Sequence, residues 1–225
     1  MKNILILPFL VFLLFCNSCS KEIKSERGGI DIITNVYFNA SRGLDNMHNF
    51  HLSRINYSGD TIIELVPDMN MPEITRDIYY IQDSLYYSLG IAGSKEIIFS
   101  DIIKNKKGSK LVNKSEGALF SNDWIPNYIN RKNLNDTLLF NKKYKRFEIN
   151  SPWSYRRFYI FKTDTILPYS MYRHAEKDYK GRVERIDTYN KKENIFVTLQ
   201  ILPRKTWDIE AKEIFEFNKF LNSKK

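Results

Sequence analysis

Cysteine is scarce: the chain has two cysteines in 225 residues, Cys16 and Cys19, and both lie close to its start. Their C-x-x-C spacing resembles a redox pair, but Cys16 lies in an apolar segment that we expect to be removed after export. Cys19 is then the one cysteine left in the mature chain. This excludes an internal disulfide and a zinc–thiolate site, although we expect an exported protein to work outside the reducing cytosol.

Motifs that carry catalysis or hold a cofactor are also missing. The chain has three histidines, and His48-x-x-His51 lacks the glutamate of an H-E-x-x-H zinc motif. It contains no G-x-S-x-G elbow, no phosphate-binding glycine loop and no dinucleotide fingerprint. We predict a protein that is not an enzyme and has no catalytic residue, cofactor or metal.

Two polar groupings in strand-like segments have structural interpretations. Glu184 and Asp187 are an odd number of residues apart, so a regular strand would place them on opposite faces. Around Arg157, we expect Phe158 and Ile160 to face the core, and Arg157 and Tyr159 to face water. Neither grouping predicts a glycosidase site or a sugar-binding clamp.

The N-terminus has the anatomy of an export signal. Lys2 precedes an apolar run over residues 4–15, which contains Pro8 and is short for a membrane-spanning helix. Ser18-Cys19 after this run resembles the lipobox of bacterial lipoproteins, although Cys16 departs from the usual Leu or Val. We predict a signal peptide over 1–18, lipidation at Cys19 and a tether over 19–29; a plain secretory signal is the alternative.

The resemblance implies an envelope protein anchored by acyl chains on Cys19, in the outer membrane of a Gram-negative bacterium. The formal net charge of +9 would suit nucleic acid, but an exported protein rarely meets it, and a solvated lysine-rich surface explains the charge. With 43% apolar and 14% aromatic residues, the chain can bury a core. We predict one β-rich domain over 30–225.

The first half of that domain mixes two periodicities. Apolar residues at three- and four-residue spacing predict a helix over 31–44. Alternating runs broken by turn residues predict hairpins, and the later segments are less regular. The expected segments are strands at 50–57, 61–66, 77–82, 85–89 and 96–103, a lysine-rich loop at 104–110, and irregular structure with helical turns over 112–141.

The second half predicts an antiparallel meander and a closing helix. Strand-length runs occupy 145–150, 155–162, 168–174, 182–190 and 195–202. Asp208 can cap a helix with Ala211, Ile214, Phe217 and Leu221 on its apolar face. The fold class is therefore α+β and β-dominated: a curved antiparallel sheet, a meander or half-barrel, with an N-terminal and a C-terminal helix packed against it.

The second half also resembles the lipoprotein-localisation-factor (LolA/LolB-like) superfamily. The resemblance rests on the strand ending in 157–161, the segment 163–169 with its Leu-Pro corner, the turn at 179–181 and the strand 186–189. It implies helices on the concave side of the sheet and an apolar cavity for acyl chains. We therefore predict a non-enzymatic lipoprotein that binds an apolar or amphipathic ligand such as a lipid. The alternative is a structural lipoprotein that presents a basic surface to a protein or glycan partner.

Four Asp-Ser/Thr-aliphatic triplets resemble the O-glycosylation acceptor of one group of Gram-negative bacteria. Their hydroxyl residues are Thr61, Ser84, Thr137 and Thr165. Ordinary turn chemistry at strand ends gives the same pattern, so both readings place these residues at turns.

Overall fold

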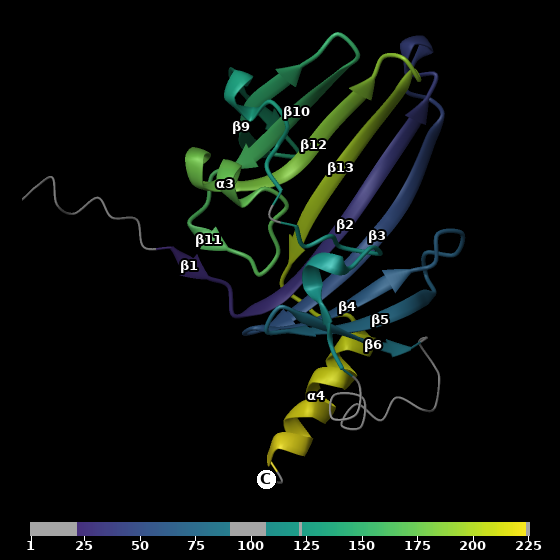
Figure 1. Ribbon diagram of the computed structural model, residues 1–225, viewed down its shortest axis with the longest axis vertical. Coiled ribbons are helices and arrows are strands. Elements are labelled where there is room, and N and C mark those ends of the chain that lie inside the picture. The colour runs from purple at the N-terminus through teal and green to yellow at the C-terminus, as the bar shows by residue number, and fades with distance from the viewer. Residues whose placement is uncertain (1–21, 91–106, 122, 224–225) are drawn as a thin grey trace, which may run out of the picture.

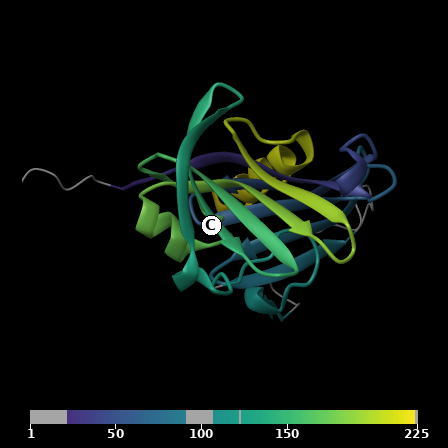
Figure 2. The ribbon, with the colours of Figure 1, turned by 90° about the horizontal axis from the view of Figure 1, so that it is seen from above.

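The computed structural model describes residues 22–90, 107–121 and 123–223, which form an open, curved antiparallel sheet with two helices (Figure 1, Figure 2). The sheet runs in the order β7-β6-β5-β4-β3-β2-β13-β12-β10-β9-β8, and β1 pairs with β11 in a separate parallel ladder. The predicted fold class, a β-dominated curved antiparallel sheet with helices against it, is confirmed.

The elements have the following bounds. The strands of the large sheet are β2 (Arg27–Phe38), β3 (Met47–Ser58), β4 (Thr61–Pro67), β5 (Thr75–Gln82), β6 (Leu85–Gly90), β7 (Ser109–Lys110), β8 (Lys132–Leu139), β9 (Lys142–Asn150), β10 (Ser154–Phe161), β12 (Arg182–Asn190) and β13 (Ile195–Arg204). The other elements are β1 (Ile23–Lys24), β11 (Thr165–Ile166), the helices α3 (Arg173–Tyr179) and α4 (Ile209–Ser223), and the 3-10 turns η1 (Ala40–Arg42), η2 (Leu111–Asn113) and η3 (Tyr128–Asn130).

The predicted helix over 31–44 is wrong, because this segment is mostly strand β2. Ile30, Ile32 and Thr34 are buried in alternation, which is the period of a strand. The segment is rich in β-branched and aromatic residues, which favour a pleated surface over a helix. β2 lies between β3 and β13 in the centre of the sheet, so pairing on both edges decided its conformation.

Most predicted hairpins are confirmed, and the errors concentrate in the connecting segments. The predicted strand over 168–174 is wrong: the chain there is a loop that leads into α3, whose end is closed by Lys180 in the left-handed conformation at φ 51°. Within 112–141 the expected helical turns η2 and η3 are present, but strand β8 was not anticipated. The predicted strand 96–103 lies outside the described residues.

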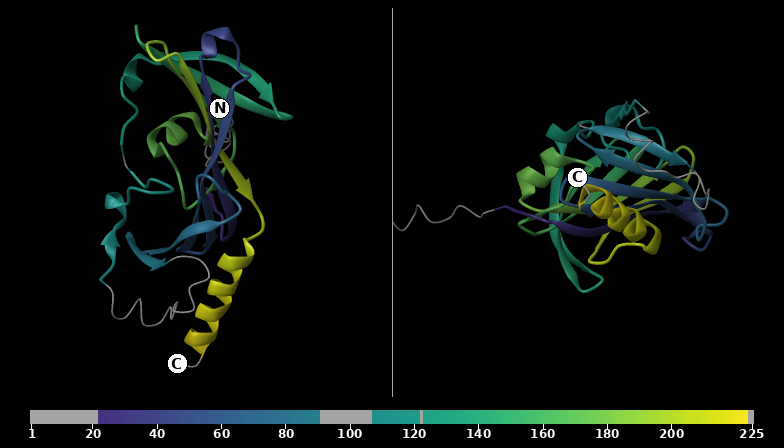
Figure 3. Two further views of the ribbon diagram at one scale, coloured as in Figure 1. Left: turned by 90° about the vertical axis from the view of Figure 1, so that its right-hand side faces the viewer. Right: turned by 90° about the horizontal axis from the view of Figure 1, so that it is seen from below.

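The sheet buries side chains on both faces. Ile62 of β4 belongs to a core that also contains Leu167 and Tyr169, whereas Ile63 and Leu65 pack against α4. Since successive strand residues point to opposite faces, α4 covers the face opposite to the one that the loop before α3 covers. Figure 3 shows α3 on the enclosed side of the curved sheet and α4 running down from its other side.

Helix α4 thus packs on the face opposite to the concave one, whereas the family resemblance implies helices on the concave face. Ala211 and Phe215 are its buried contacts, while Phe217 of the predicted apolar stripe is 44% exposed. Its first turn is fixed by Asn56, whose side-chain oxygen accepts the Asp208 backbone N–H at 2.8 Å. Asn56 also donates to the Asp208 carboxylate, so Asp208 is held as part of a polar network at the helix start.

The folded body begins before residue 30. Residues 23–24 form β1 and residues 27–29 are the first of β2, although both lie in the predicted tether. The backbone N–H groups of Ile23 and Ser25 donate to the carbonyls of Asp164 and Ile166, each at 2.9 Å. The start of the chain is therefore attached directly to the segment before α3.

Candidate functional site

Three adjoining hollows form a continuous groove on the rim of the sheet. Their volumes are about 480, 330 and 380 Å³, and all three are lined by Arg173. Ile166 and Leu167 join the first hollow to the third, and Leu111, Phe120 and Pro168 join the second to the third. We call this feature the Arg173 groove.

The groove is built where the chain leaves the β1–β11 ladder and enters α3. Pro168 ends the extended segment because it has no backbone donor to continue a ladder. Leu167 and Tyr169 turn inward and are 6% and 3% exposed, while Arg173 begins α3 and is exposed. The buried side chains of Leu167 and Tyr169 consequently give the groove an apolar floor. The Arg173 side chain lies where the three hollows meet.

Charged side chains along α3 complete the site. Arg173 and Lys177 are four residues apart on one helix, so they share a face, and Lys180 follows the last turn. Within the described residues, none of the three has a carboxylate within ion-pair distance. Arg182, which also lines the groove, is already paired with Glu184 at 2.6 Å.

A half-buried carboxyl group, Glu176, lies on the same helix and also lines the groove. Glu176 accepts a hydrogen bond from the Ser170 hydroxyl at 2.5 Å and one from the Val183 backbone N–H at 3.1 Å. Burial raises the pKa of the Glu176 carboxyl above its ordinary value of 4.5. The same cause, loss of hydration, raises the pKa of the Tyr169 phenol. Both shifts show that these two groups are poorly hydrated.

The raised pKa of Glu176 predicts a pH-dependent stability. The folded state holds this proton more tightly than the unfolded chain, so its contribution is fully present below 4.5 and is lost as the pH rises through the folded pKa. Relative to Glu176→Gln, the unmodified protein should gain free energy of unfolding as the pH falls from neutral toward 4.5. Urea unfolding of both proteins across this range measures the difference; a constant difference, or one of opposite slope, contradicts the assignment.

Part of the concave side, where the family resemblance implies an apolar cavity, is covered by the chain itself. Residues 111–120, which we call the strap, cross the inner face, and Ala118 is buried in the same core as Leu167 and Tyr169. The strap is held by Lys114, whose ammonium lies 2.8 Å from the Glu64 carboxylate with both side chains almost fully buried. Glu64 also accepts hydrogen bonds from the Ser53 hydroxyl and the Ala118 backbone N–H. A ligand would therefore occupy the groove at the rim.

Ser84 and Thr165 of the proposed glycosylation residues both line the groove. Ser84 lies in a turn, at φ 63°, and Thr61 and Thr165 are the first residues of their strands. Thr137 is different: it lies inside β8, next to a register shift, and is not at a turn. Glycosylation of the four stays a prediction, and Cys19 lies outside the described residues.

The expectation that Glu184 and Asp187 face opposite sides is wrong. The register shifts beside them, with Tyr159 opposite Arg185 and Ile160 opposite Val183, so Glu184 is an extra residue in β12. Both carboxylates consequently lie on one face. Glu184 accepts the Tyr144 hydroxyl and Asp187 the Tyr159 hydroxyl, each at 2.8 Å.

Each of these two carboxylates forms an ion pair with an arginine, so we assign them a structural role on the outer face of the sheet. Arg182 pairs with Glu184, and Arg185 pairs with Asp187 at 2.7 Å. As expected, Phe158 and Ile160 are fully buried, but Tyr159 is only 6% exposed because its hydroxyl is engaged by Asp187. Arg157 is paired with Glu148.

The histidines are dispersed. His48 and His51 lie on β3 and His174 on α3, where it stacks on Trp124 at 4.4 Å. Burial lowers the pKa of His174. In the part of the chain that the structure describes, no three His, Cys, Asp or Glu side chains are placed to hold a metal ion.

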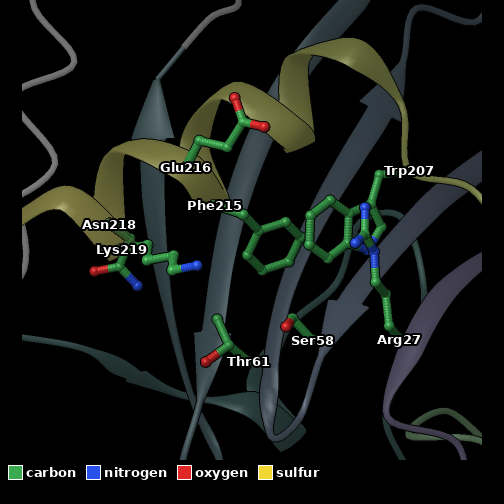
Figure 4. A pocket seen from close by; sticks show the side chains of 8 residues that line it. All are labelled: Arg27, Ser58, Thr61, Trp207, Phe215, Glu216, Asn218 and Lys219. Atoms are coloured by element: carbon green, nitrogen blue, oxygen red, sulfur yellow. The ribbon is translucent and has the colours of Figure 1, made fainter. Parts of the chain in front are cut away.

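A separate hollow of about 460 Å³ lies beside α4 (Figure 4). Trp207 stacks on Phe215 at 4.4 Å, and the Arg27 guanidinium lies 3.7 Å from the centre of the Trp207 ring. The Trp207 ring nitrogen donates to the Tyr57 carbonyl at 2.9 Å. The aromatic groups and the cation of this hollow already contact one another, so it serves mainly to attach α4 to the sheet.

Comparisons with known proteins give limited information. No family model matches the chain, and no curated protein matches it. A domain provisionally described as an outer membrane lipoprotein-sorting protein from Vibrio parahaemolyticus is similar at 12% identity and a TM-score of 0.29, covering 91% of this chain and 97% of its own. A DUF1329 family protein from Desulfovibrio piger gives 10% identity, a TM-score of 0.29, and coverages of 90% and 91%. Similarity at this level does not establish a function.

Among the described residues, no helix combines the length and apolar character needed to cross a bilayer.

Proposed function

We propose that the chain is a lipid-anchored envelope protein that acts by binding and not by catalysis, and that its ligand is an amphipathic anion such as a fatty acid or an acidic lysolipid. The observation that carries the proposal is the Arg173 groove: three joined hollows with an apolar floor and an unpaired guanidinium where they meet. Pockets of a few hundred Å³ with apolar walls and a few convergent polar groups are typical of small-molecule sites.

The chemistry of the lining selects this ligand class. A guanidinium presents a planar fork that matches a carboxylate or phosphate, and Lys177 and Lys180 add charge on the same side. Leu111, Phe120 and Leu167 offer apolar surface to a chain that extends from the head group.

Arg173→Glu tests this function. A fluorescent fatty acid should bind the soluble form, residues 20–225, at least about tenfold more tightly than it binds the variant, because a charge-assisted hydrogen bond contributes about 1.5–3 kcal/mol. Arg42→Glu is the matched control, since Arg42 is exposed in η1 at the far end of β2. Equal binding by all three proteins would overturn the proposal, and equal weakening in both variants would show an effect of net charge alone.

A second candidate is presentation of a surface to a protein or glycan partner. Trp124, Phe140 and Trp153 are each at least 70% exposed, and aromatic residues are enriched at protein interfaces. Partner retention that collapses between low and moderate salt would favour the basic surface as the contact. Because Ser84 and Thr165 line the groove, a glycan on either would compete with the ligand proposed above.

A further inference from the structure

The described chain begins on the rim of the Arg173 groove. Glu22 lines the groove, and Ile23 and Lys24 pair with Thr165 and Ile166 of β11. Figures 1 and 2 show β1, β11 and α3 together at one edge of the molecule. Cys19 precedes Glu22 by three residues, which span at most about 11 Å when extended. An acyl anchor on Cys19 therefore keeps this edge close to the bilayer.

The side chains on this edge suit contact with a lipid surface. Ile23 is 60% exposed, and Ile166, which lines the groove, is 39% exposed, so this edge presents apolar surface. Lys177 and Lys180 are exposed and unpaired among the described residues, and Lys24 has only an exposed partner, Asp60. Exposed pairs of this kind contribute little and exchange readily for other counter-charges. A basic residue near an anionic membrane surface contributes about 1 kcal/mol.

We propose that the edge formed by β1, β11 and α3 is a membrane-docking face that contacts anionic phospholipid headgroups, with the Arg173 groove opening toward the bilayer. The inference deepens the proposed function, because it makes the anchoring membrane the source of the ligand. The predicted lipidation of Cys19 would hold this face close to the bilayer. The charged and apolar side chains of the face belong to the folded body and are present without the anchor. Docking should therefore persist, at lower affinity, without the anchor.

Flotation with lipid vesicles measures docking of the soluble form, residues 20–225. We expect it to bind vesicles of phosphatidylcholine with phosphatidylglycerol and not vesicles of phosphatidylcholine alone. The double variant Lys177→Glu/Lys180→Glu should lose at least about tenfold in partitioning, given about 1 kcal/mol for each basic residue and the added repulsion. Thermal unfolding of each protein checks that the fold is retained.

The matched control makes the same charge change at the other end of the same strand. Lys180 lies just before β12, and Lys191 and Lys192 lie just after it, so about 30 Å of strand separates them. Lys191→Glu/Lys192→Glu should bind anionic vesicles as the unmodified protein does. Equal loss in both double variants, or equal binding to the two kinds of vesicle, would overturn the docking face.

The two proposals fail separately. Loss of fatty-acid binding in Arg173→Glu with unchanged vesicle binding by Lys177→Glu/Lys180→Glu would leave the groove intact and overturn the docking face. Vesicle binding that depends on Lys177 and Lys180, in a protein that binds no fatty acid, would overturn the groove as a ligand site and retain the docking face.

Discussion

Lys114→Met is expected to lower the free energy of unfolding by about 3–5 kcal/mol, because it leaves a buried carboxylate without its counter-charge. The Lys114 and Glu64 side chains are 1% and 0% exposed, so water cannot replace the lost partner. Lys114 also donates to the carbonyl of Ala118 at 3.1 Å, so its removal weakens the fold of the strap as well as its ion pair with β4. Urea unfolding followed by tryptophan fluorescence gives the measurement.

A double-mutant cycle identifies the cause. Glu64→Gln/Lys114→Met removes both charges, so it should be less destabilised than the sum of the two single variants. Additive losses would show that Lys114 acts only through packing and backbone hydrogen bonds. The strap would then be held by Ala118 and its apolar neighbours, and not by the ion pair.

Phe158→Ala should lower the free energy of unfolding by about 3–5 kcal/mol, because it leaves a cavity in the buried cluster that Phe158 forms with Phe147 and its neighbours on β10 and β12. Phe158 is fully buried and stacks on Phe147, with ring centroids 4.5 Å apart and planes at 9°. Ile160, Val183 and Ala175 complete the cluster, so the space cannot fill from solvent. Differential scanning calorimetry should show a markedly lower Tm.

Phe140→Ala removes the same atoms from an exposed site and serves as the control. Phe140 is 74% exposed at the β8–β9 turn, so its loss should change the free energy of unfolding by no more than about 0.5 kcal/mol. Comparable losses in the two variants would contradict the assignment of the core to the β9–β10–β12 face.

The sequence predicted the hairpins β3–β4 and β12–β13, because strand-length runs on either side of a polar turn identify a hairpin locally. It did not predict the extra residue at Glu184, which changes the alternation within β12. β2 was mistaken for a helix because its apolar residues also fit a three- and four-residue spacing; only its pairing with β3 and β13 decides between the two. Periodicity alone does not contain that long-range information.

The groove could not be predicted because its parts are distant in sequence. Leu111, Phe120 and Arg173 meet only after the strap crosses the inner face, and the strap is placed by a contact between Lys114 and Glu64. The sequence did not indicate that Lys114 forms a buried ion pair, since a single lysine in a polar stretch is usually solvated. The Leu-Pro segment at 167–168 did fall in the site, because a proline that ends a strand marks where the chain turns.

Native mass spectrometry of the exported soluble form, residues 20–225, gently purified and followed by lipid extraction, would show whether the Arg173 groove holds a ligand. We expect one amphipathic anion bound per chain in the unmodified protein and in Arg42→Glu, and its loss in Arg173→Glu. An unliganded mass for the unmodified protein that persists after incubation with fatty acid or acidic lysolipid would contradict it.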